Sequence, residues 1–118
     1  MKLMTKAIEK KLPKLYSQEN EKDPMVQVKY FCPWNHWIWY GIEFDGKDVF
    51  FGYVVGDYNE LGYFHLSDLV GVDGKSGAKG PIGLSIERDL YFSPKRLSEV
   101  KADIQSAMDT FQKLSTEG

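Results

Sequence analysis

The densest group of charged side chains in an apolar neighbourhood is the run Ile86-Glu87-Arg88-Asp89. In an extended segment successive side chains point to opposite sides, so Glu87 and Asp89 would share one side and Arg88 the other. An arginine can bind a phosphate or a carboxylate through two parallel hydrogen bonds while a nearby carboxylate removes a proton. The run therefore gives one hypothesis, an enzyme that acts on a small acidic or phosphorylated substrate. The alternative, which we favour, is a turn whose charges form ion pairs with neighbouring strands.

A second stretch that could do chemistry is Gly74-Lys75-Ser76-Gly77, which contains the Gly-Lys-Ser of phosphate-binding loops. In such loops the backbone amides, the lysine and the hydroxyl bind phosphate and its magnesium ion. The leading glycine of that motif falls on Leu69 here, and a glycine-rich run follows Ser76 where a helix should begin. We therefore expect a solvated loop that binds no nucleotide, and we expect no cofactor.

The remaining candidates for chemistry are His36 and His65, the only histidines, and Cys32, the only cysteine. Neither histidine has a third ligand at a recognisable spacing, so no metal site is predicted. A single cysteine cannot form an internal disulfide, and no base beside it in the sequence would activate its thiol. These residues favour neither a metal centre nor a nucleophilic enzyme.

All three tryptophans fall between Phe31 and Tyr40, in a stretch whose alternation is typical of strands. The Asp45-Gly46 pair that follows is typical of a tight hairpin turn, because both central positions of that turn need positive φ. A loop of two or four residues would decide which side chains share a sheet face. The face expected to be core then carries Ile38, Tyr40, Ile42, Val49, Phe51 and Tyr53.

The opposite face would carry Trp37, Trp39 and Phe50, with Trp34 close by. Either the long loop or the N-terminal helix covers these rings as a second small core, or they form a docking surface for a protein or for stacked bases. Lys29 is the only cation that the strands are expected to place there, which favours a protein over a nucleic acid. The candidate partner-binding residues are therefore Trp34, Trp37, Trp39 and Phe50.

The elements that must position these residues form a single domain over residues 1–118. Apolar residues at helical spacing, the capping Thr5 and the break at Pro13 predict a short N-terminal helix. Runs of alternating side chains predict strands, which must pair antiparallel because too few residues separate them for parallel crossovers. The predicted strands are 25–31, 36–44, 48–55 and 61–66, with a last one at 90–92.

After the strands, a flexible glycine-rich loop is expected over about 71–83, and helical spacing predicts a C-terminal helix over about 94–114. We thus expect an α+β fold in which an antiparallel meander sheet of four to five strands has both terminal helices packed on one face.

The charge balance limits the classes of partner. A net charge of −2, from 15 basic and 17 acidic residues, gives no overall field that would hold a polyanion. A nucleic-acid-binding role would need a local patch, for which the first helix offers Lys6, Lys10, Lys11 and Lys14. No stretch approaches the ~20 apolar residues of a membrane span, and lysines interrupt the N-terminus where a secretory signal would be apolar. We expect a cytoplasmic protein without membrane contact.

Three segments together resemble the uncharacterised family named domain of unknown function 2958: YFCPWNHWIWYGIEFD, FFGYVVGDYNELGYFHLSDL and GPIGLSIERDLYF. The similarity extends to about Val100. Members of that family are encoded on plasmids, phages and integrative elements, so the resemblance implies an accessory role in a mobile genetic element. It implies no reaction, cofactor or catalytic residue. The chain differs from the family pattern in its additional GKSGAKG residues and in Ser85, where a proline is common.

The sequence thus favours a small accessory protein that binds another protein through its aromatic sheet face and catalyses no reaction. Two alternatives stay open, an enzyme that uses Glu87, Arg88 and Asp89, and a nucleic-acid-binding module.

Overall fold

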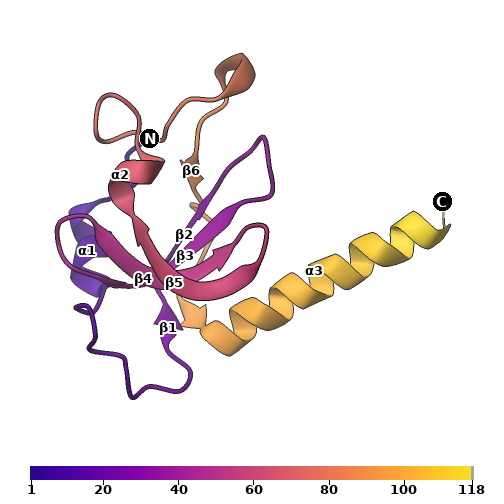
Figure 1. Ribbon diagram of the computed structural model, residues 1–118, viewed down its shortest axis with the longest axis horizontal. Coiled ribbons are helices and arrows are strands. Elements are labelled where there is room, and N and C mark those ends of the chain that lie inside the picture. The colour runs from indigo at the N-terminus through magenta and orange to yellow at the C-terminus, as the bar shows by residue number, and fades with distance from the viewer. Residues whose placement is uncertain (118) are drawn as a thin grey trace.

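A computed structural model describes residues 1–117 as an α+β fold, as predicted (Figure 1). The elements, in chain order, are α1 (Lys6–Lys11), β1 (Met25–Val26), β2 (Val28–Phe31), β3 (Ile38–Phe44), β4 (Val49–Val55), β5 (Asn59–His65), α2 (Leu66–Leu69), the short 3-10 helix η1 (Pro81–Gly83), β6 (Glu87–Arg88), β7 (Lys95–Arg96) and α3 (Leu97–Glu117).

Five strands form one antiparallel sheet in the order β5-β4-β3-β2-β6, and β1 pairs with β7 in a separate small sheet. The predicted meander is confirmed for β2 to β5. The strand predicted over 25–31 is interrupted at Gln27, so Val26 and Val28 belong to different cores. The strand predicted at 90–92 is wrong, because the Asp89 carboxylate accepts the Tyr91 N–H at 2.9 Å and turns the chain after β6.

The β3–β4 hairpin has the predicted face assignment over most of its length, but its turn differs. Tyr40 lies opposite Tyr53 and Trp39 opposite Val54, which places the side chains of alternate residues as expected. Residues 45–48 connect the strands, and the Asp45 carboxylate accepts the backbone N–H groups of Lys47, Asp48 and Val49. A bulge at Ile42 absorbs the shift in register and restores the predicted pairing from Gly41 onward.

The two terminal helices cover different faces of the sheet, which corrects the expectation that both pack on one face. Side chains flanking and within α1 join the cluster on the face of Phe50, Trp37 and Trp39, here called the tryptophan face. The start of α3 joins the cluster on the other face, here called the groove face, with Tyr40 and Tyr53. Large apolar side chains alternate onto both faces of β3 and β4, so each face needs its own cover. The buried members on the tryptophan face are Leu3, Leu12, Val28, Tyr30, Cys32, Phe44, Phe50, Phe64, Leu69 and Ile86, and on the groove face Val26, Tyr40, Ile42, Leu97 and Val100.

Polar contacts attach the N-terminal third to the sheet. Thr5 caps α1 as predicted, since its hydroxyl accepts the Ile8 N–H at 3.2 Å. The Tyr30 hydroxyl donates to the Leu3 carbonyl at 2.7 Å, and burial raises the pKa of Tyr30. The Glu43 carboxylate on β3 is buried, where it accepts the N–H groups of Tyr16 and Gln18 at 2.9 and 2.8 Å. These bonds hold the segment after α1 against β3.

Candidate functional site

The tryptophan face is packed against other parts of the chain. The rings of Trp37 and Trp39 stack with centroids 6.1 Å apart, and both pack half-buried against the larger core. Two glycines let the backbone approach the rings: a Cβ at Gly56 would lie 2.5 Å from the Trp37 ring, and one at Gly80 would lie 2.6 Å from Trp34. Gly80 belongs to the long loop, so the loop does fold across the aromatic hairpin.

The residues expected to bind a partner are therefore distributed between core and surface. Phe50 is completely buried, so its role is packing. Trp37 and Trp39 are half-buried, and Trp34 is 37% exposed at the tip of the β2–β3 hairpin. Of the two interpretations of these rings, the geometry favours the covered core. Lys29, expected on this face, lies on the opposite one, with its ammonium 5.8 Å from the centroid of the Tyr40 ring.

The glycine-rich loop is held by backbone hydrogen bonds on both sides. Ala78 donates to the Leu69 carbonyl at 2.8 Å, and Ile86 donates to the Ala78 carbonyl at 3.0 Å. The Gly-Lys-Ser stretch lies within this arrangement, with the Lys75 carbonyl accepting the Leu3 N–H at 3.0 Å. The Asp73 carboxylate accepts the N–H groups at 75 and 76, and no helix begins directly after Ser76, since the next one is η1 at Pro81. The backbone amides that a phosphate would need are thus engaged within the protein.

The side chains of Glu87, Arg88 and Asp89 do not converge on one site. Arg88 donates to the Lys2 carbonyl at 3.4 Å, on the side where the N-terminal segment packs. Asp89 forms an ion pair with Lys29 at 3.3 Å. Glu87 lies opposite Phe31 in the β2–β6 pairing. The arrangement matches the structural interpretation of this run better than a catalytic one.

The two histidines and the cysteine have different surroundings. His65 Nδ1 lies 3.0 Å from an Asp48 oxygen, which also accepts the Ser67 hydroxyl at 2.9 Å. These contacts and the Ser67 N–H lower the pKa of Asp48. Cys32 is buried, and His36 is exposed beside the groove described next. Among residues 1–117, no group of three or more His, Cys, Asp or Glu side chains is placed to hold a metal ion.

The surface that the sequence did not reveal is a groove on the groove face. It measures about 760 Å³ and lies between the outer side of β3 and β4 and the middle of α3. Its apolar lining comes from Ile38, Val55, Ile104, Ala107 and Met108. The polar side chains around this lining are Lys29, His36, Asp57, Asn59 and Asp103, with the rings of Tyr40 and Tyr58.

Two of the charged side chains that line this groove, Lys29 and Asp103, form ion pairs with residues beside it. Lys29 pairs with Asp89, and Lys95 pairs with Asp103 at 2.9 Å. Burial, with a smaller effect of nearby carboxylates, raises the pKa of Tyr40 to about 12. Tyr40 is thus a neutral hydroxyl near neutral pH. An apolar lining with paired charges suits binding an apolar segment better than proton transfer.

A family model described as Protein of unknown function (DUF2958) matches residues 3–109, which is nearly the whole chain. The chain belongs to this family. The resemblance seen in the sequence is thereby confirmed, and the match extends beyond Val100 into α3. Comparison with curated proteins and with solved structures gave no match.

The DUF2958 match ends within α3, at residue 109. Every residue that lines the groove lies within 3–109, including Ile104 and Met108 on α3. Phe111 and Leu114 lie beyond the match. Within residues 1–117, α3 is the one helix of bilayer-spanning length, and it is too polar to qualify as a membrane span.

Sequence patterns could not have located the groove, because it depends on where α3 crosses the sheet. The apolar face of α3 was predicted, as was the face shared by Ile38 and Tyr40. Neither pattern indicates that the helix leaves the sheet beyond Ile104. A partial signal was present in the sequence, because Met108, Phe111 and Leu114 continue the apolar face of this helix through its last turns.

Proposed function

We propose that this DUF2958 chain is a non-enzymatic binding module that holds an apolar segment of a polypeptide in the groove between β3, β4 and α3. The observation that supports this proposal is the groove itself, with an apolar lining and charged residues around it. Binding sites of this kind take affinity from buried apolar side chains and orientation from a few polar groups. The binding surface is thus moved from the tryptophan face to the opposite side of the sheet.

An amphipathic helix is the type of segment that this groove suits best. One wall of the groove is itself a helix, and two helices pack through side chains at three- and four-residue spacing. Tyr58, which is 81% exposed, stands at the opening of the groove and can cover such a segment. Tyrosine is common among the residues that dominate binding at protein interfaces.

The cell context is part of the same proposal. The family resemblance supports an accessory role in a mobile genetic element. The free, buried thiol of Cys32 is compatible with the reducing cytoplasm.

Photo-crosslinking tests the groove directly. Tyr58 would be replaced by p-benzoylphenylalanine, a photoreactive residue of similar shape, and the variant irradiated in cells. Tyr91, which is 97% exposed and does not line the groove, provides a matched control position. We expect a crosslinked polypeptide from position 58 and none from position 91. Equal crosslinking at both positions, or none at either, would contradict the proposal.

A further inference from the structure

The helix α3 has two halves with different surroundings. Its apolar side chains follow the alternating three- and four-residue spacing of a heptad, at Leu97, Val100, Ile104, Ala107, Phe111 and Leu114. The first three are buried or half-buried against the chain's own sheet. Phe111 is 74% exposed and Leu114 is 64% exposed. One continuous apolar stripe is therefore covered for half of its length only.

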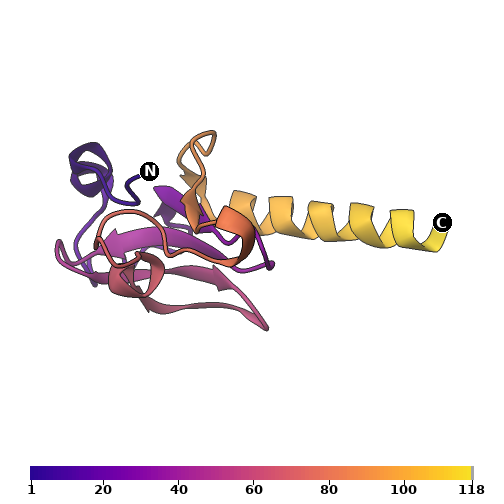
Figure 2. The same ribbon diagram turned by 90° about the horizontal axis from the view of Figure 1, so that it is seen from above.

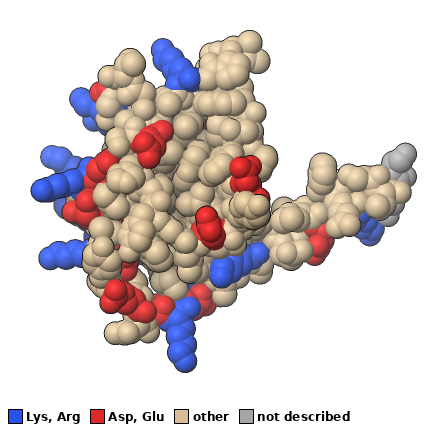
Figure 3. All heavy atoms as spheres, viewed as in Figure 1, with Lys and Arg blue, Asp and Glu red and all other residues tan. Residues whose placement is uncertain are grey.

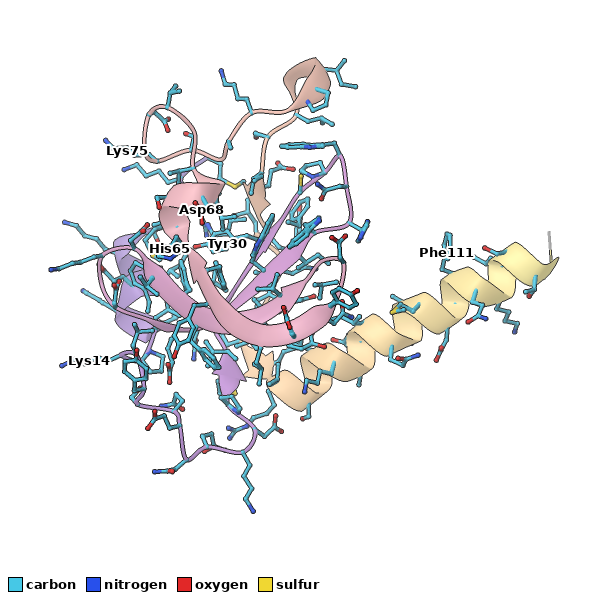
Figure 4. All side chains as sticks on the ribbon, viewed as in Figure 1. Lys14, Tyr30, His65, Asp68, Lys75 and Phe111 are labelled. Atoms are coloured by element: carbon cyan, nitrogen blue, oxygen red, sulfur yellow. The ribbon has the colours of Figure 1, made fainter. Side chains whose placement is uncertain are left out.

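The uncovered half runs away from the body of the molecule (Figure 2). Figure 4 shows the Phe111 ring standing off α3 with no part of the sheet beside it. Few Lys, Arg, Asp or Glu side chains are seen along this half in Figure 3, where the body carries many more. A helical segment of about 12 residues is marginal in water without tertiary packing. Its apolar stripe indicates that a partner covers it.

The groove and this uncovered stripe adjoin each other on the same helix. A second, shallower hollow is lined by Asp103, Ala107, Phe111 and other α3 residues, and it shares Asp103 and Ala107 with the groove. A receptive surface and a protruding apolar surface thus lie end to end. A surface that contains both complementary parts can pair with a second copy of itself about a two-fold axis.

We infer that the occupant of the groove is the distal half of α3 from a second copy of this chain. The inference rests on the proposed function, because it assigns the ligand of the same groove. The two α3 helices run antiparallel, so that the partner's Leu114 enters the groove beside Ile104 and the partner's Phe111 packs near the small Ala107. Both contacts occur twice in the symmetric pair, and neither copy is left with an uncovered stripe.

The area and the charges agree with this pairing. The four large exposed side chains Tyr58, Met108, Phe111 and Leu114 are between 55% and 81% exposed. At ~150–250 Å² for each large side chain, they would bury about 500 Å² per copy, near the lower limit for a specific interface. Lys113 is the one cation beyond residue 105, and in an antiparallel pair it approaches the acidic side of the partner's groove at Asp103. Interfaces near this lower limit are typical of weak, transient association, and we expect a micromolar dissociation constant.

Sedimentation equilibrium over about 1–300 µM, which brackets a micromolar constant, measures this association. We expect the mass to rise with concentration from 13.6 kDa toward twice that value.

The variant Phe111→Asp places a charge in the interface and should stay monomeric throughout. Because Phe111 lies outside both cores, the melting temperature of this variant should match that of the wild type at low concentration, where both are monomeric. The control Gln112→Asp adds the same charge one residue away, off the apolar stripe, and should dimerise like the wild type. A wild type that stays monomeric at the highest concentration, or a Phe111→Asp variant that still dimerises, overturns the inference.

Crosslinking from position 58 separates this inference from the proposed function. A product of twice the chain mass that is lost in Phe111→Asp supports both. Crosslinks only to other polypeptides, from a chain that remains monomeric, would overturn the second copy as occupant and leave the binding function intact. A dimer that forms without any crosslink at position 58 would overturn the assignment of the groove as the surface that binds. If the second copy occupies the groove, Phe111→Asp should also increase crosslinking to other polypeptides, because a competing segment has been removed.

Discussion

The two faces of the sheet begin with similar side chains and end with different roles. On the tryptophan face, the N-terminal segment and the glycine-rich loop pack over the sheet, and Phe50 beneath them is fully buried. On the groove face the cover consists of the first turns of α3, Val26 of β1 and Phe92, and Phe51, the next residue along β4, is half-buried. The difference shows that aromatic content alone does not identify a binding surface. What decides is whether the chain itself supplies enough apolar cover for that face.

The strongest test of this comparison replaces the adjacent phenylalanines one at a time. Phe50→Ala should lower the free energy of unfolding by ~3–5 kcal/mol, because it leaves a cavity in a closed core. Phe51→Ala should cost only about 1–2 kcal/mol, since its ring is already partly in water. Urea denaturation of both variants measures the difference. Equal losses would mean that the groove face is covered as completely as the tryptophan face.

The second test opens the cover of the tryptophan face. A Cβ at Gly77 would lie 1.7 Å from the Ile86 carbonyl oxygen, which belongs to the backbone and cannot simply rotate away. Gly77→Ala should therefore destabilise the protein by roughly 2–3 kcal/mol, as overpacking does. Tryptophan fluorescence should shift to longer wavelength as the loop moves off the rings.

Gly62→Ala is the matched control for that change. A Cβ at Gly62 would meet no atom within 4 Å, so its stability and fluorescence should stay close to those of the wild type. A Gly77→Ala variant that melts and fluoresces like this control would show that the loop does not close over the hairpin as described.

The third test uses the titration of the Tyr40 hydroxyl on the groove face. The pKa of Tyr40 is raised to about 12, mainly by burial, whereas a tyrosine in the unfolded chain titrates near 10. Between these values the unfolded chain has lost the proton and the folded chain retains it, so stability is complete below pH 10 and falls as pH rises toward 12. The free energy of unfolding should fall by about 2 kcal/mol between pH 9 and pH 11.5 through this one group. Tyr40→Phe should lose less stability across this range than the wild type, measured by urea denaturation at pH 9 and pH 11.5. Identical pH profiles would mean that Tyr40 is well solvated.

The sequence predicted the fold because its main signals are local. Thr5 and Pro13 delimit α1, and alternation identifies β3 and β4. The Asp45-Gly46 pair correctly placed a turn, but it could not reveal the bulge at Ile42, which depends on how both strands pack on two cores. Local signals therefore give elements and most of the pairing, and miss irregularities that tertiary packing imposes.

The candidate site was predicted less well, because it depends on long-range contacts. Covering of Trp34 requires Gly80, which lies 46 positions later in the sequence, and nothing local to either residue indicates the contact. The groove likewise forms between β4 and the middle of α3. The alternation of Glu87, Arg88 and Asp89 was predicted correctly, but their partners Lys2 and Lys29 were not, since both come from the N-terminal third.

The smallest expected effect concerns Arg88 and Asp89, which make their contacts on opposite sides of the sheet edge. Arg88→Ala removes one long hydrogen bond, of 3.4 Å, to the Lys2 carbonyl, so it should cost less than ~1 kcal/mol. Asp89→Ala removes both the ion pair with Lys29 and the acceptor for the Tyr91 N–H, and should cost about 1–2 kcal/mol. Side-chain contacts of this kind stabilise the fold. Thermal melts of both variants at low and high salt measure these losses, and only the Asp89→Ala loss should shrink as salt screens the ion pair. A larger loss for Arg88→Ala than for Asp89→Ala would mean that the arginine makes a stronger contact within the protein than the single bond to the Lys2 carbonyl, and would contradict the contacts described for this run.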